Sequence, residues 1–418
     1  MNIEEAPVKQ KLLVVGGGAA GFFCAINAAR LNPALQVIIV EKTSKLLAKV
    51  RVSGGGRCNV THACFENSAL VKKYPRGGNF LKKAFQHFST TDTIRWFEGR
   101  GVALKTEADG RMFSITDSSQ TIIDCLIAEA NRYGVQIVMN RAVVNITRSA
   151  GCFNVFFAGN EQTTATSICF ATGGYPKTAM FDWLCSLGHT IEVPVPSLFT
   201  FNMPGNPIVS LMGVAVSNAA VRISGSKLSE SGPLLITHWG MSGPAILKLS
   251  AWGARELANK DYRFFLMVNW LPDHNEQSLR EYWPSIRSER AAQKIANRNP
   301  FGLPGRLWEY LLVESGIKAD IRWADLPGKE QNKLIKNLTA QEFAVTGKTT
   351  FKEEFVTCGG IALNEVDPST MQSRLVPGLY FAGEVLNVDG ITGGFNFQHA
   401  WTSGWIAAAA IAGTQPVL

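Results

Sequence analysis

The hydrophobic pattern of the first 190 or so residues alternates between short apolar runs and longer amphipathic stretches. Apolar runs lie at 11–15, 37–40, 134–139 and 167–170, helix-like stretches lie at 19–30, 80–99 and 121–133, and a hairpin is expected near 102–115. Such alternation is typical of βα units built on a parallel sheet. The pattern therefore predicts an α/β fold for this part of the chain.

The pattern changes twice along the rest of the chain. Short β-type runs at 198–202, 214–223, 232–237 and 262–268 predict a small barrel or sandwich, and 275–338 is helical in period. A glycine-punctuated α/β pattern returns near residue 355. We therefore expect one α/β domain from 1–194 and 353–418, an inserted β-barrel domain from 195–274 and 339–352, and a helical subdomain from 275–338.

The first apolar run leads directly into a glycine turn. GGGAAG at 16–21 follows the run, an alanine-rich stretch follows the turn, and the second run ends at Glu41. In a Rossmann-like βαβ unit the glycines allow the tight turn, the approach of a pyrophosphate and close helix packing. The diphosphate then lies at a helix N-terminus. Glu41 suits a hydrogen bond to an adenosine ribose. This segment predicts a dinucleotide site and leaves FAD and NAD open.

Three further glycine segments bear on that choice. SGGGRCN at 53–59 exposes backbone N–H groups beside polar donors, and ATGG at 171–174 ends a strand. Near the C-terminus GLYFAGE ends at Glu384, and TGGFN covers 392–396. A late strand ending in Gly-Glu is a flavoprotein signature whose acid holds ribitol hydroxyls, and a simple NAD domain has no need of it. The four segments together favour FAD.

The predicted contacts with this cofactor come from both ends of the chain. They are Gly16, Gly18, Ala19, Ala20, Gly21, Glu41, Lys42, Ser53, Gly54, Gly55, Arg57, Cys58, Asn59, Val143, Thr172, Gly173, Gly174, Gly383, Glu384, Gly393, Gly394, Phe395 and Asn396.

The set of motifs also resembles a known family. GGGAAG, SGGGRCNVT, ATGG, THWGMSGPAIL, VTCGGI and GLYFAGEVLNVDGITGGFNFQHAW are similar to segments of the bacterial BaiN/RdsA, or aminoacetone-oxidase-like, NAD(P)/FAD-dependent oxidoreductases. The resemblance spans nearly the whole chain and implies an FAD domain built from both ends, with an inserted β-barrel and a helical subdomain. Asn387 departs from it, because members often carry Asp there. The family's activities, which include amine oxidation and reduction of conjugated enones, do not name a substrate.

Composition limits the remaining possibilities. The 418 residues contain 46% hydrophobic and 18% charged side chains, as in an ordinary globular protein. No apolar run is long enough for a membrane span, and residues 1–7 lack the features of a signal peptide, so we expect a cytoplasmic protein. The eight cysteines form no C-x-x-C pair, and no His/Cys spacing resembles a zinc site, so we expect no metal. Cys58 and Cys64 are spaced C-x5-C, which disfavours a redox disulfide, and we expect Cys58 to pack beside the cofactor.

These observations predict an FAD-dependent oxidoreductase with non-covalently bound FAD. Hydride would pass between flavin and an unidentified small-molecule substrate in a cleft between the FAD domain and the insertion, with electrons exchanged with transiently bound NAD(P)H or with oxygen. No catalytic residue is established, and His238 is the candidate because histidine transfers protons near neutral pH.

The net charge of +8 and the basic segment Lys72–Lys83 keep an alternative open, a flavin-dependent RNA-modifying or RNA-binding protein. We expect the basic segment to be a solvated face or to attract an anionic cofactor, and we do not expect nucleic acid as a partner.

Overall fold

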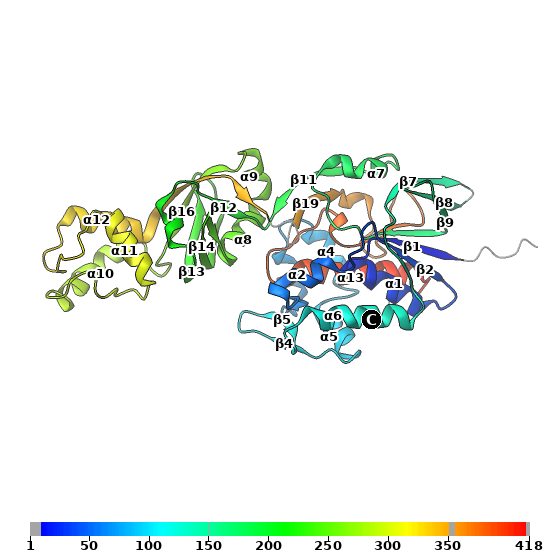
Figure 1. Ribbon diagram of the computed structural model, residues 1–418, viewed down its shortest axis with the longest axis horizontal. Coiled ribbons are helices and arrows are strands. Elements are labelled where there is room, and N and C mark those ends of the chain that lie inside the picture. The colour runs from blue at the N-terminus through cyan, green and yellow to red at the C-terminus, as the bar shows by residue number, and fades with distance from the viewer. Residues whose placement is uncertain (1–9, 150, 351–355, 415–418) are drawn as a thin grey trace, which may run out of the picture. The chain divides into compact units, whose positions relative to one another are not determined.

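The computed structural model describes residues 10–149, 151–350 and 356–414 and contains two compact units (Figure 1). We call Met1–Pro196 with Phe351–Leu418 the discontinuous unit, and Ser197–Thr350 the inserted unit. The predicted re-entry at residue 353 lies outside the described residues, as do residues 1–7.

A five-stranded parallel sheet forms the centre of the discontinuous unit. Its order is β20 (Leu379–Phe381), β10 (Ser167–Phe170), β1 (Lys11–Val15), β2 (Gln36–Val40) and β6 (Gln136–Val138). Nearly every side chain of β1 and β10 is buried, as expected for strands covered on both faces. The fold is thus α/β and Rossmann-like, and its edge strand β20 comes from the far end of the chain.

Two helices from opposite chain ends pack together beside this sheet. They are α1 (Ala19–Leu31) and α13 (Phe395–Ile411), and both are mostly buried. Gly404 permits this packing, since a Cβ at that position would lie 2.7 Å from the carbonyl oxygen of Ala20. The close approach fixes the end of the chain against its beginning.

The helical stretch predicted from Phe80 to Gly99 is two helices, α4 (Gly78–Ala84) and α5 (Thr90–Glu98). The break occurs because Ser89 begins a new helix: its backbone N–H donates to the Asp92 carboxylate at 2.8 Å. The continuous-helix prediction was wrong because helical period alone does not reveal a cap.

The remaining elements of the discontinuous unit are mostly short. They are α2 (Ala48–Gly56), β3 (Thr61–His62), α3 (Asn67–Leu70), η1 (Val71–Lys73), β4 (Leu104–Thr106), β5 (Arg111–Ser114), α6 (Ser119–Arg132), β7 (Val143–Ser149), β8 (Cys152–Phe157), β9 (Gln162–Ala165), η2 (Thr178–Phe181), α7 (Asp182–Cys185), β11 (Ile191–Ser197), β19 (Val356–Ile361), η4 (Leu363–Glu365) and η5 (Gly383–Val385).

The inserted unit contains a strongly curled antiparallel sheet. Its order is β17 (Gln341–Thr346), β16 (Arg263–Asn269), β13 (Ala215–Ile223), β14 (Ser229–Thr237), β15 (Gly240–Ser242), β12 (Thr200–Asn202) and β18 (Lys348–Thr349). The strands β17 and β18 are consecutive in the chain and yet pair at opposite edges of the sheet. The chain therefore crosses from one edge of the sheet to the other between these two strands, and the β-barrel stays a prediction.

Helices complete the inserted unit. They are η3 (Pro207–Leu211), α8 (Pro244–Trp252), α9 (Ala254–Asn259), α10 (Glu276–Glu289), α11 (Gly305–Glu314) and α12 (Gly328–Ala340). Buried side chains of α10, α11 and α12 belong to the same hydrophobic core as the strands. Trp283, Trp308 and Trp323 lie in that core, and the ring of Trp323 is 5.6 Å from that of Trp283. Among the helices of the described ranges, none is both long and apolar enough to cross a bilayer.

A buried ion pair joins two distant segments of the discontinuous unit. The Arg76 Nε–H donates to Asp389 Oδ1 at 2.6 Å, and a second hydrogen bond joins Nη2 to Oδ2. The Asp389 side chain is completely buried. The pair therefore holds the chain before α4 against the loop that precedes α13.

Removal of this carboxylate is expected to be strongly destabilising. The Asp389→Ala variant removes the buried carboxylate that pairs with the mostly buried Arg76 guanidinium, which costs roughly 3–5 kcal/mol of unfolding free energy. The Glu161→Ala variant, which removes the exposed ion pair with Arg141, is the control and should cost less than about 1 kcal/mol. Urea unfolding followed by tryptophan fluorescence measures both, and equal losses would contradict the prediction.

Candidate cofactor site

The first glycine turn joins β1 to α1, and its glycines face different surroundings. A Cβ on Gly16 would lie 2.4 Å from the Ala171 carbonyl oxygen, and one on Gly21 would lie 2.0 Å from the Gly16 carbonyl oxygen. A Cβ on Gly18 would meet nothing within 4 Å. The outer two glycines thus permit close packing, whereas Gly18 borders open space, as a pyrophosphate-binding turn requires.

The helix that follows this turn begins without a cap. Gly18 is the N-cap of α1, no side chain caps the helix, and its first turn contains no acidic residue. The first N–H groups of a helix have no partner within it and carry partial positive charge. An anion such as a diphosphate fits there, next to the space at Gly18.

Glu41 follows β2 and is fixed by backbone donors. Its Oε2 accepts the Gly17 N–H at 2.9 Å, and its Oε1 accepts the Thr43 N–H at 2.9 Å. The carboxylate borders a hollow of about 60 Å³, which is lined by Val15, Gly16, Val40, Glu41, Lys42, Arg141, Ala142, Val143, Thr172, Tyr175 and Trp183. The structure therefore places Lys42, Val143 and Thr172, all predicted contacts, beside the predicted ribose ligand.

The other glycine segments meet this turn and one another. A Cβ on Gly383 would lie 2.8 Å from the Ala20 Cβ, and one on Gly174 would lie 2.9 Å from Glu384 Oε1. A Cβ on Gly394 would lie 2.6 Å from the Thr61 carbonyl oxygen. Four segments that are far apart in the sequence thus converge on one place in the discontinuous unit.

The triple-glycine segment is partly helical. The assigned helix α2 spans Ala48–Gly56, but its backbone leaves the helical region at Ser53, and Gly54 and Gly55 have φ of 59° and 69°. A Cβ on Gly55 would meet nothing within 4 Å. The left-handed turn therefore leaves a bare stretch of backbone, which glycine adopts without steric cost.

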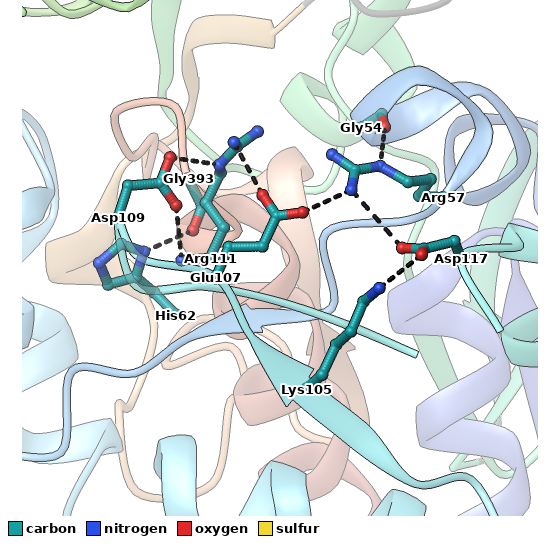
Figure 2. A network of polar contacts seen from close by, with 9 residues as sticks. All are labelled: Gly54, Arg57, His62, Lys105, Glu107, Asp109, Arg111, Asp117 and Gly393. Atoms are coloured by element: carbon teal, nitrogen blue, oxygen red, sulfur yellow. Dashed lines mark hydrogen bonds and ion pairs between the residues drawn. The ribbon is translucent and has the colours of Figure 1, made fainter. Parts of the chain in front are cut away.

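The Arg57 guanidinium points into a charged network instead of into open space (Figure 2). Its Nη1 lies 2.5 Å from Glu107 Oε1 and 3.5 Å from Asp117 Oδ1, and its guanidinium carbon lies 4.0 Å from the centroid of the Phe113 ring. The Lys105 ammonium also pairs with Asp117 and lowers the pKa of that carboxyl group. In this structure the guanidinium that we expected at the cofactor contacts carboxylates from outside the predicted site.

His62 lies near the charged network around Arg57. Sequence reasoning did not identify it as a candidate site residue. Its Nδ1 is 3.1 Å from the Gly393 carbonyl oxygen, which is an acceptor, so this nitrogen carries the hydrogen (Figure 2). Its ring centroid is 4.7 Å from that of Phe395. His62 thus contacts both the turn before α13 and the first residue of that helix. Its position directly after the SGGGRCNVT motif is a signal that could have identified it.

The C-terminal acid has close partners. Glu384 Oε2 lies 2.6 Å from the Lys49 ammonium, and Oε1 accepts the Thr357 N–H at 2.8 Å. Nearby, the Thr357 Oγ1 and Asn387 Oδ1 atoms are buried and have no hydrogen-bond partner in the structure. Buried polar atoms are normally paired, so these two atoms indicate a polar ligand. This observation, together with the open N-terminus of α1, fits a cofactor that has both hydroxyl and phosphate groups.

Phe395 and Asn396 begin α13. The Asn396 side chain accepts the Gly390 N–H at 2.8 Å and donates to the Gly390 carbonyl oxygen at 3.0 Å, so it shapes the preceding loop. Gly394 is the N-cap of this helix in a left-handed conformation, and no side chain caps it. The site therefore contains a second uncapped helix N-terminus.

Cys58 follows the triple-glycine segment and is buried, and burial raises the pKa of its thiol to about 12. The thiol is therefore neutral at pH 7 and a poor nucleophile. None of the eight cysteines, which all lie within the described ranges, forms a disulfide. Within the same ranges no group of three or more His, Cys, Asp or Glu side chains could hold a metal ion.

His238 belongs to the inserted unit, in the turn between β14 and β15, and its side chain is exposed. Its ring contacts the Trp239 ring edge to face at 4.2 Å, and the Trp239 Nε1–H donates to Thr200 Oγ1 at 2.9 Å. A catalytic role of His238 stays a prediction.

Residues 10–410 match the family described as the HI0933-like protein Rossmann domain. The chain belongs to this family. The family resemblance identified from the motifs is confirmed, and so are the α/β Rossmann-like fold and FAD as the cofactor. This HI0933-like protein is an FAD-dependent oxidoreductase.

Two curated members of the family match nearly the full chain. The ribosomal RNA dihydrouridine synthase of Escherichia coli is 31% identical over 407 residues, which are 95% of this chain and 96% of that protein. The 3-dehydro-bile acid delta(4,6)-reductase of Clostridium scindens is 27% identical over 409 residues, which are 96% and 98% of the two chains.

Solved structures share the fold at low identity. The 3-ketosteroid-delta4-(5alpha)-dehydrogenase of Rhodococcus jostii has a TM-score of 0.51 and 13% identity, and the match covers 98% of both chains. The FrdA chain of the Escherichia coli quinol fumarate reductase has a TM-score of 0.50 and 16% identity over 97% of this chain and 70% of that chain. These likenesses show the fold alone.

The residues of the HI0933-like site fit FAD, which supplies hydride chemistry when bound. The N-terminus of α1 would hold the diphosphate, while Glu41 and Glu384 would accept hydrogen bonds from the sugar hydroxyls at the two ends of the cofactor. Gly393 and Gly394 would present backbone N–H groups to the flavin. The protein's own contribution is thus position, hydrogen bonding and charge.

The different surroundings of Gly18 and Gly21 lead to a test. Aspartate is a favourable N-cap, so the Gly18→Asp variant should keep the stability of the apoprotein. Its dissociation constant for FAD should nevertheless be roughly a hundredfold higher, because a carboxylate would face the diphosphate. This corresponds to a loss of about 2.8 kcal/mol of binding free energy. The Gly21→Ala variant should instead lose about 1–3 kcal/mol of stability through the clash with Gly16.

Flavin fluorescence titration and thermal unfolding of the apoproteins separate these two effects. Unchanged FAD affinity in Gly18→Asp would place the diphosphate elsewhere.

His399 leads to a prediction about pH. It is buried in α13, its Nε2 is 3.1 Å from the Gly383 carbonyl oxygen, and burial lowers its pKa to about 4. In this pH range His399 is protonated in the unfolded chain and neutral in the folded chain. The free energy of unfolding therefore falls as the pH drops from about 6.5 to about 4.

His399→Gln removes this titration, so the loss of unfolding free energy between pH 7.5 and pH 5 should be smaller by roughly 1–2 kcal/mol. Urea unfolding of both proteins at the two pH values measures the difference. Identical pH dependence would show that His399 is not a buried neutral group.

Proposed function

We propose that this HI0933-like protein is a reductase that adds hydrogen across a ring carbon–carbon double bond, and that uridine in ribosomal RNA is its substrate. The main support for this proposal is the 31% identity to a ribosomal RNA dihydrouridine synthase over 95% of this chain. The second curated relative is named as a delta(4,6)-reductase, so both names describe reduction of ring double bonds.

The proposed reaction consumes one NAD(P)H and one proton for each double bond. The hydride reduces one ring carbon through the flavin, and a proton is added to the neighbouring carbon. NAD(P)⁺ is released, and the double bond becomes a single bond. Electron supply by a nicotinamide is part of the proposal, and the oxidase direction with oxygen is its alternative.

Two histidines are candidates for the proton step. His62 contacts the Gly393–Phe395 segment of the FAD site through its Nδ1, which lies 3.1 Å from the Gly393 carbonyl oxygen, and through its ring. His238 is exposed on the inserted unit beside Trp239. Imidazole suits such transfers near neutral pH.

Complementation tests the substrate. The chain is expressed in an Escherichia coli strain that lacks its own ribosomal RNA dihydrouridine synthase, and ribosomal RNA is digested and analysed for dihydrouridine by mass spectrometry. We expect dihydrouridine to return with the wild-type chain and not with Gly18→Asp, which serves as the cofactor-deficient control. Absence of dihydrouridine despite a soluble, FAD-loaded protein would refute uridine as the substrate.

The same purified protein tests the direction of electron flow. Under anaerobic conditions NADH or NADPH should bleach the flavin absorbance bands. A flavin that stays oxidised with both nucleotides would refute the nicotinamide-driven reductase.

Reduction of a small-molecule enone is the second candidate function. It is supported by the 27% identity to the bile acid reductase over 96% of this chain. Oxidation of NAD(P)H that depends on an added steroid-type enone, without dihydrouridine formation, would favour this candidate.

A further inference from the structure

We propose that residues 290–336 of the inserted unit carry an RNA-binding surface centred on Lys294 and Arg322. This inference rests on the proposed function, because it assigns the contact through which a ribosomal RNA substrate is held. It differs from the basic segment Lys72–Lys83, whose Arg76 forms the buried ion pair with Asp389.

The two central cations are placed side by side by the backbone. An isolated antiparallel bridge pairs Lys294 with Arg322, and the Ile295 N–H donates to the Ile321 carbonyl oxygen at 2.9 Å. The Trp323 N–H donates to the Gln293 carbonyl oxygen at 3.0 Å on the other side of the bridge. Side chains directly opposite each other on antiparallel strands lie about 5 Å apart at Cβ. Two positive charges are therefore held next to each other.

This arrangement is unfavourable for the protein alone. Both side chains are exposed, and like charges directly opposite each other destabilise a strand pair. Asp320 and Asp325 lie close in sequence to Arg322, yet in the described part of the chain neither carboxylate forms an ion pair with Arg322 or Lys294. A bound polyanion would convert the repulsion into attraction.

Further cations lie in the same stretch of the inserted unit. From Arg290 to Trp308 every charged residue is a cation, and Lys318 precedes Arg322 on the opposing segment. The helix α12 adds Lys329, Lys333 and Lys336, which are all exposed. Their spacing places these three ammonium groups on one face of the helix.

The scaffold beneath these cations is rigid. The opposite face of α12 buries Leu334, Ile335 and Leu338, and Trp323 next to Arg322 lies in the same core. The Arg287 guanidinium donates to Gln331 Oε1 at 3.2 Å and to the Ala324 carbonyl oxygen at 2.6 Å. Arg287 thus ties α10 to α12 and to the segment that follows Arg322.

A nucleic-acid backbone is the occupant that fits this chemistry. It offers a row of phosphates to a row of Lys and Arg side chains, and each neutralised phosphate releases counterions. A bile-acid-type enone carries a single carboxylate, so it offers one charge to this row of side chains, whereas an RNA backbone offers many. The surface therefore favours the RNA substrate over the small-molecule candidate.

The test compares two double variants with the same change in charge. Lys294→Glu/Arg322→Glu alters the surface, and Lys227→Glu/Arg263→Glu alters two other exposed cations of the inserted unit. The probe is deproteinised ribosomal RNA from the Escherichia coli strain without the synthase, and filter binding is measured from 50 to 300 mM KCl.

We expect the surface variant to bind this RNA about tenfold more weakly at 100 mM KCl. Its slope of log K against log[KCl] should fall by roughly 1.4–1.8, as for two lost phosphate contacts. The control variant should bind within twofold of wild type. Flavin bleaching by NAD(P)H should be unchanged in both variants, and their tryptophan fluorescence should match wild type, which shows that the inserted unit with its buried Trp283, Trp308 and Trp323 is folded.

The outcomes separate this inference from the proposed function. Equal binding by wild type and the surface variant, or no RNA binding by wild type at 50 mM KCl, overturns the RNA-binding surface. If the surface variant binds weakly while wild-type protein forms no dihydrouridine, the surface stands and the proposed reaction fails.

Discussion

The close approach of the two chain ends is the constraint on which the cofactor site depends. The first turn of α1 touches η5 at Gly383 and the middle of α13 at Gly404, in each case where a side chain would collide with Ala20. Gly404 faces the Ala20 carbonyl group and Gly383 faces the Ala20 methyl group, so the turn at Gly16 and the acid at Glu384 are held in fixed relation. Larger residues at either glycine would separate segments that only function together.

The site also contains two helix N-termini without caps, and the cofactor explains why. The N-termini of α1 and α13 lack both side-chain caps and first-turn acids. An exposed helix in isolation would be stabilised by a Ser, Asp or Asn cap, so their absence at two helices of one site is a cost to the protein without its cofactor. Bound FAD, with its anionic diphosphate and polar flavin edge, would supply the missing partners. Fold stability and cofactor binding are therefore coupled through the same backbone groups.

Local sequence predicted the parts of this site whose chemistry is local. The turn at 16–21 and Glu41 lie within one βαβ unit, where spacing fixes geometry. Sequence reasoning was less informative where partners come from distant segments. The Arg57 guanidinium pairs with Glu107, 50 residues along the chain, and His62 contacts Gly393 across an even longer separation. No periodicity encodes such pairs, because the hairpin of β4 and β5 and the turn before α13 are brought to α2 only by tertiary packing. Sequence reasoning did not predict the buried ion pair of Arg76 and Asp389 for the same reason.

The family relationship distinguishes the FAD site, which relatives share, from the positions that determine the substrate. Relatives named for ribosomal RNA and for a bile acid align with this chain over nearly its full length. Whatever distinguishes their substrates must therefore lie in side chains and not in the presence of a domain. The segments that build the FAD site leave little freedom at Gly16, Gly21, Gly383 and Gly394, where an added Cβ would lie less than 3 Å from another atom. Exposed positions over a well-packed core are free to vary at small cost in stability. The adjacent charges of Lys294 and Arg322 are of this kind, and their repulsion is more readily explained by selection for a polyanionic partner than by stability.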